Sequence, residues 1–128
     1  MTFNDVTPNL VVADLDRSLA FYRDVLGFTV VTTVPEQPPF GFAWMQRDTV
    51  SVFLNSEDVS KLKTNAGTNM LFITLQSDDV TSGVDALHAA LKDRAPVTME
   101  LVTQFYGMRE FAIQDPDGYA VIFAQPVR

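Results

Sequence analysis

Apolar side chains recur twice along the chain with the spacing of one face of a helix. One stripe follows Asp14 and the other follows Asp79, and each runs at i, i+4, i+7 and i+11. The members are Leu15, Leu19, Tyr22 and Leu26 in the first stripe and Val80, Val84, Leu87 and Leu91 in the second. Because an aspartate side chain can accept hydrogen bonds from the first amides of a helix, each helix is predicted to begin at its Asp.

Short apolar and β-branched runs flank both stripes and predict strands. One run precedes each stripe and three runs follow it. The predicted strands are residues 10–13, 28–34, 40–45 and 50–54 in the first half and 70–75, 97–103, 108–114 and 119–124 in the second. Each half therefore has the order strand, helix, strand, strand, strand, which predicts one module repeated. The alternative is that two amphipathic helices share this spacing by chance.

A polar, glycine-containing segment separates the two halves. We expect a single domain over residues 1–128, in which a linker at 57–68 joins a first module at 5–56 to a second at 69–126. The order Asp115-Pro116-Asp117-Gly118 is typical of a type I turn and is predicted to join the last two strands.

The two halves also correspond at their ends. A shift of 70 positions places Phe53 on Phe123 and Phe42 on Ala112. The prediction that follows is that the last two strands of each half have the same inward and outward pattern.

Composition and charge exclude several classes of function. Nine basic and sixteen acidic residues give a net charge of −7, and the basic residues are scattered, so a nucleic-acid partner is not expected. The chain has no cysteine, which excludes disulfides and cysteine-based zinc sites. No apolar run approaches the ~20 residues of a membrane helix, and Met1–Asp5 lacks the features of a signal peptide. A cytoplasmic location without membrane partners is therefore expected.

Two segments and the module order resemble a known family. Residues 10–28 resemble the opening strand and helix, and residues 106–123 the closing hairpin, of the vicinal oxygen chelate superfamily. This superfamily includes glyoxalase I, extradiol dioxygenases and bleomycin-resistance proteins, and the hairpin is most similar to the bleomycin-resistance branch. The resemblance implies an α+β fold of two tandem βαβββ modules, which form a curved mixed sheet around a concave cleft, and a homodimer.

The resemblance also implies where a metal ligand would stand in the enzymes of the superfamily. In these enzymes a ligand usually lies seven residues before each capping Asp, which here gives Thr7 and Phe72. Another usually lies four residues after the closing turn, which gives Ile122, and the repeat places Val52 at the equivalent position. If each of these positions is moved by two residues along its strand, the side chain stays on the same face. The positions are then Asp5, Met70, Leu54 and Ala124 or Ala120. Neither set supplies the imidazoles and carboxylates that a divalent metal needs, so no metal, cofactor or catalytic residue is predicted.

Strand alternation then predicts the side chains that line the cleft. If Ile122 faces the cleft, the repeat turns Val50, Val52 and Leu54 the same way and Phe53 into the core. The predicted ligand-binding residues are Phe40, Phe42, Trp44, Val52, Phe72, Tyr106, Arg109, Glu110 and Ile122. Aromatic faces can stack on a planar ligand or hold a cation, and Glu110 could pair with a positive group. The aromatic residues could equally fill the space between modules or form a dimer contact.

Three hypotheses of function follow. The preferred one is a small-molecule-binding protein that resembles bleomycin-resistance proteins and sequesters a hydrophobic or cationic ligand without metal chemistry. The first alternative is a glyoxalase- or dioxygenase-type enzyme with a non-standard or absent metal site. The second is an accessory interaction domain with a vestigial cleft. The sole histidine, His88, is predicted to flank the second helix without a catalytic partner.

Overall fold

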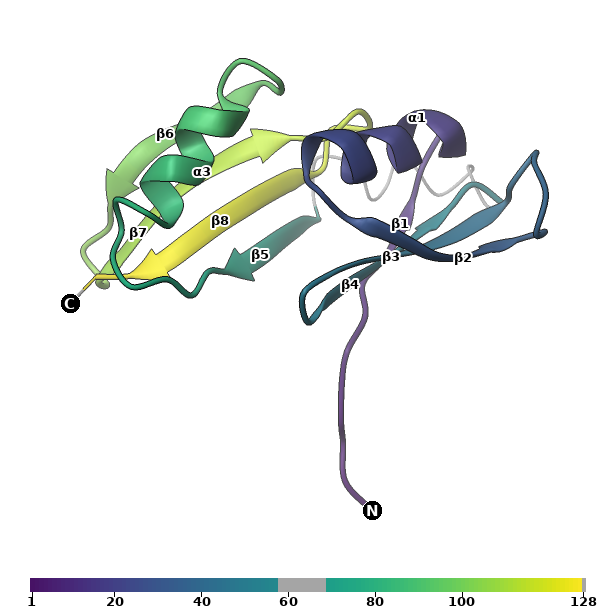
Figure 1. Ribbon diagram of the computed structural model, residues 1–128, viewed down its shortest axis with the longest axis horizontal. Coiled ribbons are helices and arrows are strands. Elements are labelled where there is room, and N and C mark those ends of the chain that lie inside the picture. The colour runs from purple at the N-terminus through teal and green to yellow at the C-terminus, as the bar shows by residue number, and fades with distance from the viewer. Residues whose placement is uncertain (58–68, 128) are drawn as a thin grey trace. The chain divides into compact units, whose positions relative to one another are not determined.

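Two compact units with the same order of elements make up the computed structural model, which describes residues 1–57 and 69–127 (Figure 1). The units are Met1–Asn65 and Ala66–Arg128. The predicted linker lies outside the described residues, except for Glu57. The predicted α+β fold of two tandem modules is confirmed.

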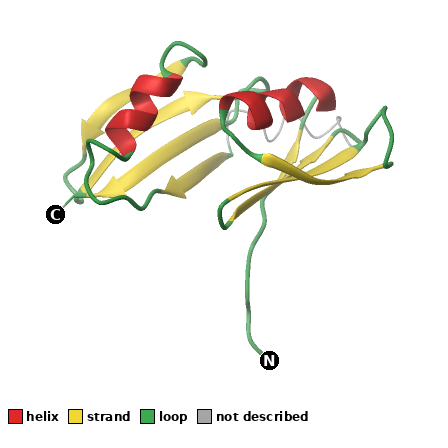
Figure 2. Ribbon diagram, in the orientation of Figure 1, coloured by secondary structure: helices red, strands yellow, loops and turns green. Residues whose placement is uncertain are grey.

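The first unit is a four-stranded mixed sheet with helical structure on one face (Figure 2). Its elements are β1 (Asn9–Val11), α1 (Leu15–Ala20), a π-helical segment (Phe21–Val25), β2 (Thr29–Val34), β3 (Phe42–Arg47) and β4 (Val50–Asn55). The strand order is β1-β4-β3-β2, with β1 parallel to β4 and the other neighbours antiparallel.

The second unit repeats this plan. Its elements are β5 (Met70–Thr74), α3 (Val84–Leu91), β6 (Val97–Thr103), β7 (Met108–Gln114) and β8 (Ala120–Pro126). The strand order is β5-β8-β7-β6, with β5 parallel to β8. All eight predicted strands are present, with ends within two residues of their predicted positions. In the described part of the chain, no helix is long and apolar enough to cross a membrane.

The first helix begins where the sequence predicts. The Arg17 amide donates to Asp14 Oδ1 at 3.1 Å, which satisfies one of the free amides of the first turn. The predicted stripe is the buried face of this helix, with each member at most 7% exposed. Gly27, at φ 75°, ends the helical segment, and Arg47 Nη1 donates to the Leu26 carbonyl at 2.7 Å.

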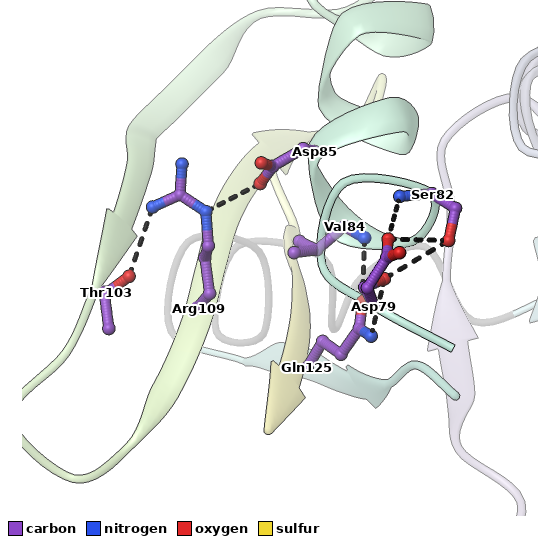
Figure 3. A network of polar contacts seen from close by, with 7 residues as sticks. All are labelled: Asp79, Ser82, Val84, Asp85, Thr103, Arg109 and Gln125. Atoms are coloured by element: carbon purple, nitrogen blue, oxygen red, sulfur yellow. Dashed lines mark hydrogen bonds and ion pairs between the residues drawn. The ribbon is translucent and has the colours of Figure 1, made fainter. Parts of the chain in front are cut away.

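The second helix begins later than predicted. Asp79 caps a preceding turn, in which the Ser82 amide donates to Asp79 Oδ1 at 2.8 Å, and the helix itself begins at Val84. The Val84 amide instead donates to the side chain of Gln125 on β8, at 2.9 Å (Figure 3). Thr, Ser and Gly at positions 81–83 are weak helix formers, so a distant residue supplies the cap. The predicted start at Asp79 is therefore wrong.

Side chains of the first sheet alternate between a buried face under the helix and an open face. On the buried face, Met45 pairs with Val52, and these residues are 0% and 1% exposed. On the opposite face, Trp44 pairs with Phe53. The predicted outward orientation of Val52, and of Leu54 with it, is therefore wrong, and so is the predicted core position of Phe53.

The reason for this reversal is the length of two hairpin loops. Two residues separate Arg47 from Val50, whereas five separate Gln114 from Ala120. These lengths differ by an odd number, so no single shift can superpose both strands of the two hairpins. A shift of 70 preserves the facing of β3 and turns β4 over, because a one-residue slip moves every side chain of a strand to the other face.

The second sheet follows the predicted alternation. Phe111 pairs with Phe123 and Ile113 with Val121, and all four are buried on the face that α3 covers. The intervening positions, Glu110 among them, lie on the open face.

Candidate functional site

Three contacting aromatic rings lie on the open face of the first sheet. The Phe53 ring centroid lies 5.1 Å from that of Phe42 and 6.0 Å from that of Trp44. Trp44 Nε1 donates to Ser51 Oγ on the neighbouring strand at 3.1 Å, which fixes the orientation of the indole. All three rings are half-buried. We call Phe42, Trp44 and Phe53 the aromatic platform, a preordered apolar surface on a rigid sheet.

The structure groups the predicted aromatic residues differently from the sequence analysis. Phe42 and Trp44 lie together as predicted, whereas Phe40 precedes β3 and is half-buried. Phe53 was missed. Its position follows from the Arg47–Val50 hairpin, because counting outward from a two-residue loop pairs Trp44 with Phe53.

A buried carboxylate lies on the open face of the second sheet. Glu110, on β7, is 3% exposed. Its Oε1 accepts hydrogen bonds from Gln104 Nε2, at 3.1 Å, and from the Tyr106 hydroxyl. Its Oε2 is buried and has no hydrogen-bond partner among the described residues. A buried carboxylate oxygen without a donor is costly, so this half of the group is open to a further partner.

Tyr106 covers one side of this carboxylate from the loop between β6 and β7. Its side chain is 51% exposed, and its hydroxyl reaches back to Glu110. The hydrogen bond to Glu110 is the main cause that raises the pKa of Tyr106 above its usual range, since ionisation would break the bond and add a charge beside the carboxylate.

Apolar side chains continue the same open face. Phe72 on β5 is paired with Ile122 on β8, which is paired with Ala112 on β7. Phe72 is 52% exposed and Ile122 is half-buried. The second sheet therefore has one buried acidic group beside an apolar strip of Phe72, Ile122 and Ala112, in which solvent reaches Phe72 and Ile122.

Arg109 does not belong to this face. It precedes Glu110 on β7, and successive strand residues point to opposite faces. Its Nε donates to Asp85 on α3 at 2.6 Å, and its Nη1 donates to Thr103 Oγ1 at 3.1 Å (Figure 3). Arg109, a predicted ligand-binding residue, therefore lies on the face that α3 covers, and its contacts join α3 to the sheet.

Two other polar residues, His88 and Asp115, make contacts within the fold. His88 lies on α3 with its ring edge against Phe111, at a centroid distance of 5.1 Å, and its Nε2 is 3.6 Å from Glu100 Oε2. Asp115 Oδ1 accepts the amides of Asp117 and Tyr119, at 2.9 Å each, inside the predicted turn. The predicted turn is confirmed.

The residues at the positions that the enzymes of the superfamily use do not fit a divalent metal. Phe72 and Ile122 offer no donor, and Thr7 offers only a hydroxyl. On β4 the open-face positions are held by Ser51, Phe53 and Asn55 rather than by a histidine or a carboxylate. Among the residues in the described ranges, no three of His, Cys, Asp or Glu come together in a group that could hold a metal ion.

The module order, the two sheets and these faces define a protein class. A family model described as the Glyoxalase/Bleomycin resistance protein/Dioxygenase superfamily matches residues 3–123. The chain therefore belongs to this superfamily, and the predicted resemblance, including that to the bleomycin-resistance branch, is confirmed.

Individual relatives cover almost the whole chain. It is 27% identical to a bleomycin resistance protein of Geobacillus stearothermophilus over 131 residues, which cover 94% of this chain and 96% of the relative. It is 30% identical to a lactoylglutathione lyase of Haemophilus influenzae over 129 residues, which cover 91% and 87%. The bleomycin-binding protein of Streptomyces verticillus, solved with copper(II)-bleomycin, matches with a TM-score of 0.72 at 20% identity and 96% coverage of both chains, which supports the fold.

Proposed function

We propose that this chain binds a hydrophobic, planar small molecule and sequesters it without catalysing a reaction. The aromatic platform is the observation that carries this proposal. Its three rings are held in contact by a sheet, and they lie on the face opposite the helix. A preordered aromatic surface binds a planar group with little loss of conformational entropy. The net charge of −7 favours neutral or cationic ligands over anions.

The names of the relatives support a ligand of the bleomycin class. One curated relative is a bleomycin resistance protein and one solved structure is a bleomycin-binding protein. A lyase activity such as that named for the Haemophilus relative is not proposed, because the donor set described above does not fit a metal ion.

Fluorescence titration with metal-free glycopeptides of the bleomycin class tests this proposal. Trp44 is the only tryptophan, so a change in emission under selective tryptophan excitation reports on the surroundings of this member of the platform. Replacing Phe53 with leucine should weaken binding about 3- to 10-fold, since one aromatic contact contributes roughly 0.5–1.5 kcal/mol beyond its area.

Phe21→Leu is the matched control, because it removes a half-buried ring from the helical segment of the same unit. Equal affinities of Phe53→Leu and Phe21→Leu would exclude the platform as the binding surface. No emission change and no heat in calorimetry with any member of the class would exclude this class of ligand.

We further propose that the chain acts in the cytoplasm and, as its resemblance to the superfamily implies, that it acts as a homodimer. Sedimentation velocity should give a species with the mass of two chains at micromolar concentration. A species with the mass of one chain across the concentration range would contradict the dimer, and the binding proposal would then be tested on the monomer.

A further inference from the structure

Glu110 is only 3% exposed, and among the described residues its Oε1 has hydrogen-bond donors whereas its Oε2 has none. Both donors that reach it, from Gln104 and Tyr106, bind the same oxygen, Oε1. Neither donor carries a charge. Among the residues that the structure describes, this carboxylate therefore has no cationic donor.

Tyr106, which hydrogen-bonds to Glu110, lies in a loop that is exposed to solvent. Tyr106 is half exposed, and its neighbour Phe105 is 99% exposed, so solvent surrounds the outer part of this loop. Backbone hydrogen bonds close the loop at its base, where the Gln104 amide donates to the Met108 carbonyl at 2.7 Å. A rotation of the Tyr106 side chain would therefore free Glu110 Oε1 without opening the sheet.

The surroundings favour a protonated amine over a metal ion. One carboxylate, one amide and one phenol lie at the site, together with the Met99 sulfur, which is 3.8 Å from Gln104 Nε2. Hard metal ions need several oxygen ligands, whereas an ammonium group offers three donors and is stabilised by one carboxylate. The apolar strip of Phe72, Ile122 and Ala112 on the same face fits the hydrocarbon part of such a molecule.

We propose that Glu110 is a subsite for the protonated amine of a small-molecule ligand, and that Tyr106 leaves the carboxylate to admit it. The proposal rests on the proposed small-molecule binding, and it assigns a chemical class to the ligand group that the open face of the second sheet binds. The Tyr106 hydroxyl occupies Oε1 in the free protein, so an ammonium group that bridges Oε1 and Oε2 displaces it.

A pair of probes that differ only in charge tests this subsite. The probes are n-hexylammonium and n-hexanol at pH 7, where the amine is protonated. Binding is followed by methyl NMR shifts of Ile122, Ala112 and Met99. The unmodified chain should bind the amine at least 5-fold more tightly than the alcohol. Equal affinity for both probes would overturn the proposal.

Two variants are expected to act in opposite directions. Glu110→Gln should abolish the preference for the amine, whereas Tyr106→Phe should strengthen amine binding about 3- to 10-fold because no hydroxyl has to be displaced. Weaker amine binding by Tyr106→Phe would overturn the role of Tyr106. This variant also keeps the test decisive if Glu110→Gln fails to fold.

Glu100→Gln is the matched control, since its carboxylate lies on β6 with a side chain that is 80% exposed. It should bind the amine as the unmodified chain does, and a loss of preference in this variant would assign the effect to net charge and overturn the subsite. Failure here is distinguishable from failure of the proposed function, because the platform is read by Trp44 emission. Methyl NMR shifts that respond to the amine and not to the alcohol, without a change in Trp44 emission on titration with the glycopeptides, support the subsite alone.

Discussion

Replacing Phe111 with alanine should lower the free energy of unfolding by about 3–5 kcal/mol, the usual cost of removing a fully buried aromatic ring. Phe111 is 0% exposed, stacks on Phe123 at a centroid distance of 5.3 Å, and contacts the edge of His88. Its ring therefore fills the space between α3 and the second sheet, and alanine would leave a cavity. Urea unfolding followed by circular dichroism measures the change.

Phe105→Ala is the control for this prediction. Phe105 is 99% exposed, so its removal should change the free energy of unfolding by no more than about 0.5 kcal/mol. A cost for Phe111→Ala of less than about 1 kcal/mol would show that this ring is not part of a close-packed core.

Gly83→Ala should cost about 2–4 kcal/mol, because the new methyl group would occupy the place of a capping side chain. A Cβ at this position would lie 2.0 Å from Gln125 Oε1 and 2.8 Å from Ser77 Cβ. Gln125 is buried, and it accepts the Val84 amide and donates to the Asp79 carbonyl, at 3.1 Å. Displacing it leaves the start of α3 without its cap (Figure 3).

A double-mutant cycle tests whether Gly83 acts through Gln125. Gln125→Ala alone should also destabilise the second unit, and Gly83→Ala should cost clearly less in that background than in the unmodified chain. Additive costs would show that the glycine is needed for another reason. Gly107→Ala is a useful comparison, because Gly107 has φ 83° with no atom near its Cβ position, so only backbone strain of about 1 kcal/mol is expected.

The order of elements could be predicted from the sequence because each element depends on local spacing. The stripe after Asp14 requires only a helical period and a capping side chain, and both are visible within a dozen residues. The strands at 97–103 and 108–114 were predicted with their observed bounds for the same reason. The second helix was placed too early because its cap comes from Gln125, which is distant in the sequence.

The facing of individual strands could be predicted only where the pairing was correct. Glu110 and Ile122 were expected on one face of the second sheet and lie there. Val52 and Phe53 were exchanged, because the two hairpin loops differ in length by an odd number of residues. An error of one residue in the register leaves the strand in place but turns each of its side chains to the opposite face of the sheet.

The sequence by itself therefore determined the repeated module, the first helix and its cap, and the closing turn, since these depend on neighbours along the chain. Only the tertiary structure decided that Phe53 joins the aromatic platform, that Arg109 pairs with Asp85, and that Gln125 caps α3. It also decided that Glu110 is buried and that its Oε2 has no hydrogen-bond partner in the described part of the chain. Such contacts join residues far apart in the sequence, and strand register and side-chain packing determine them rather than local pattern.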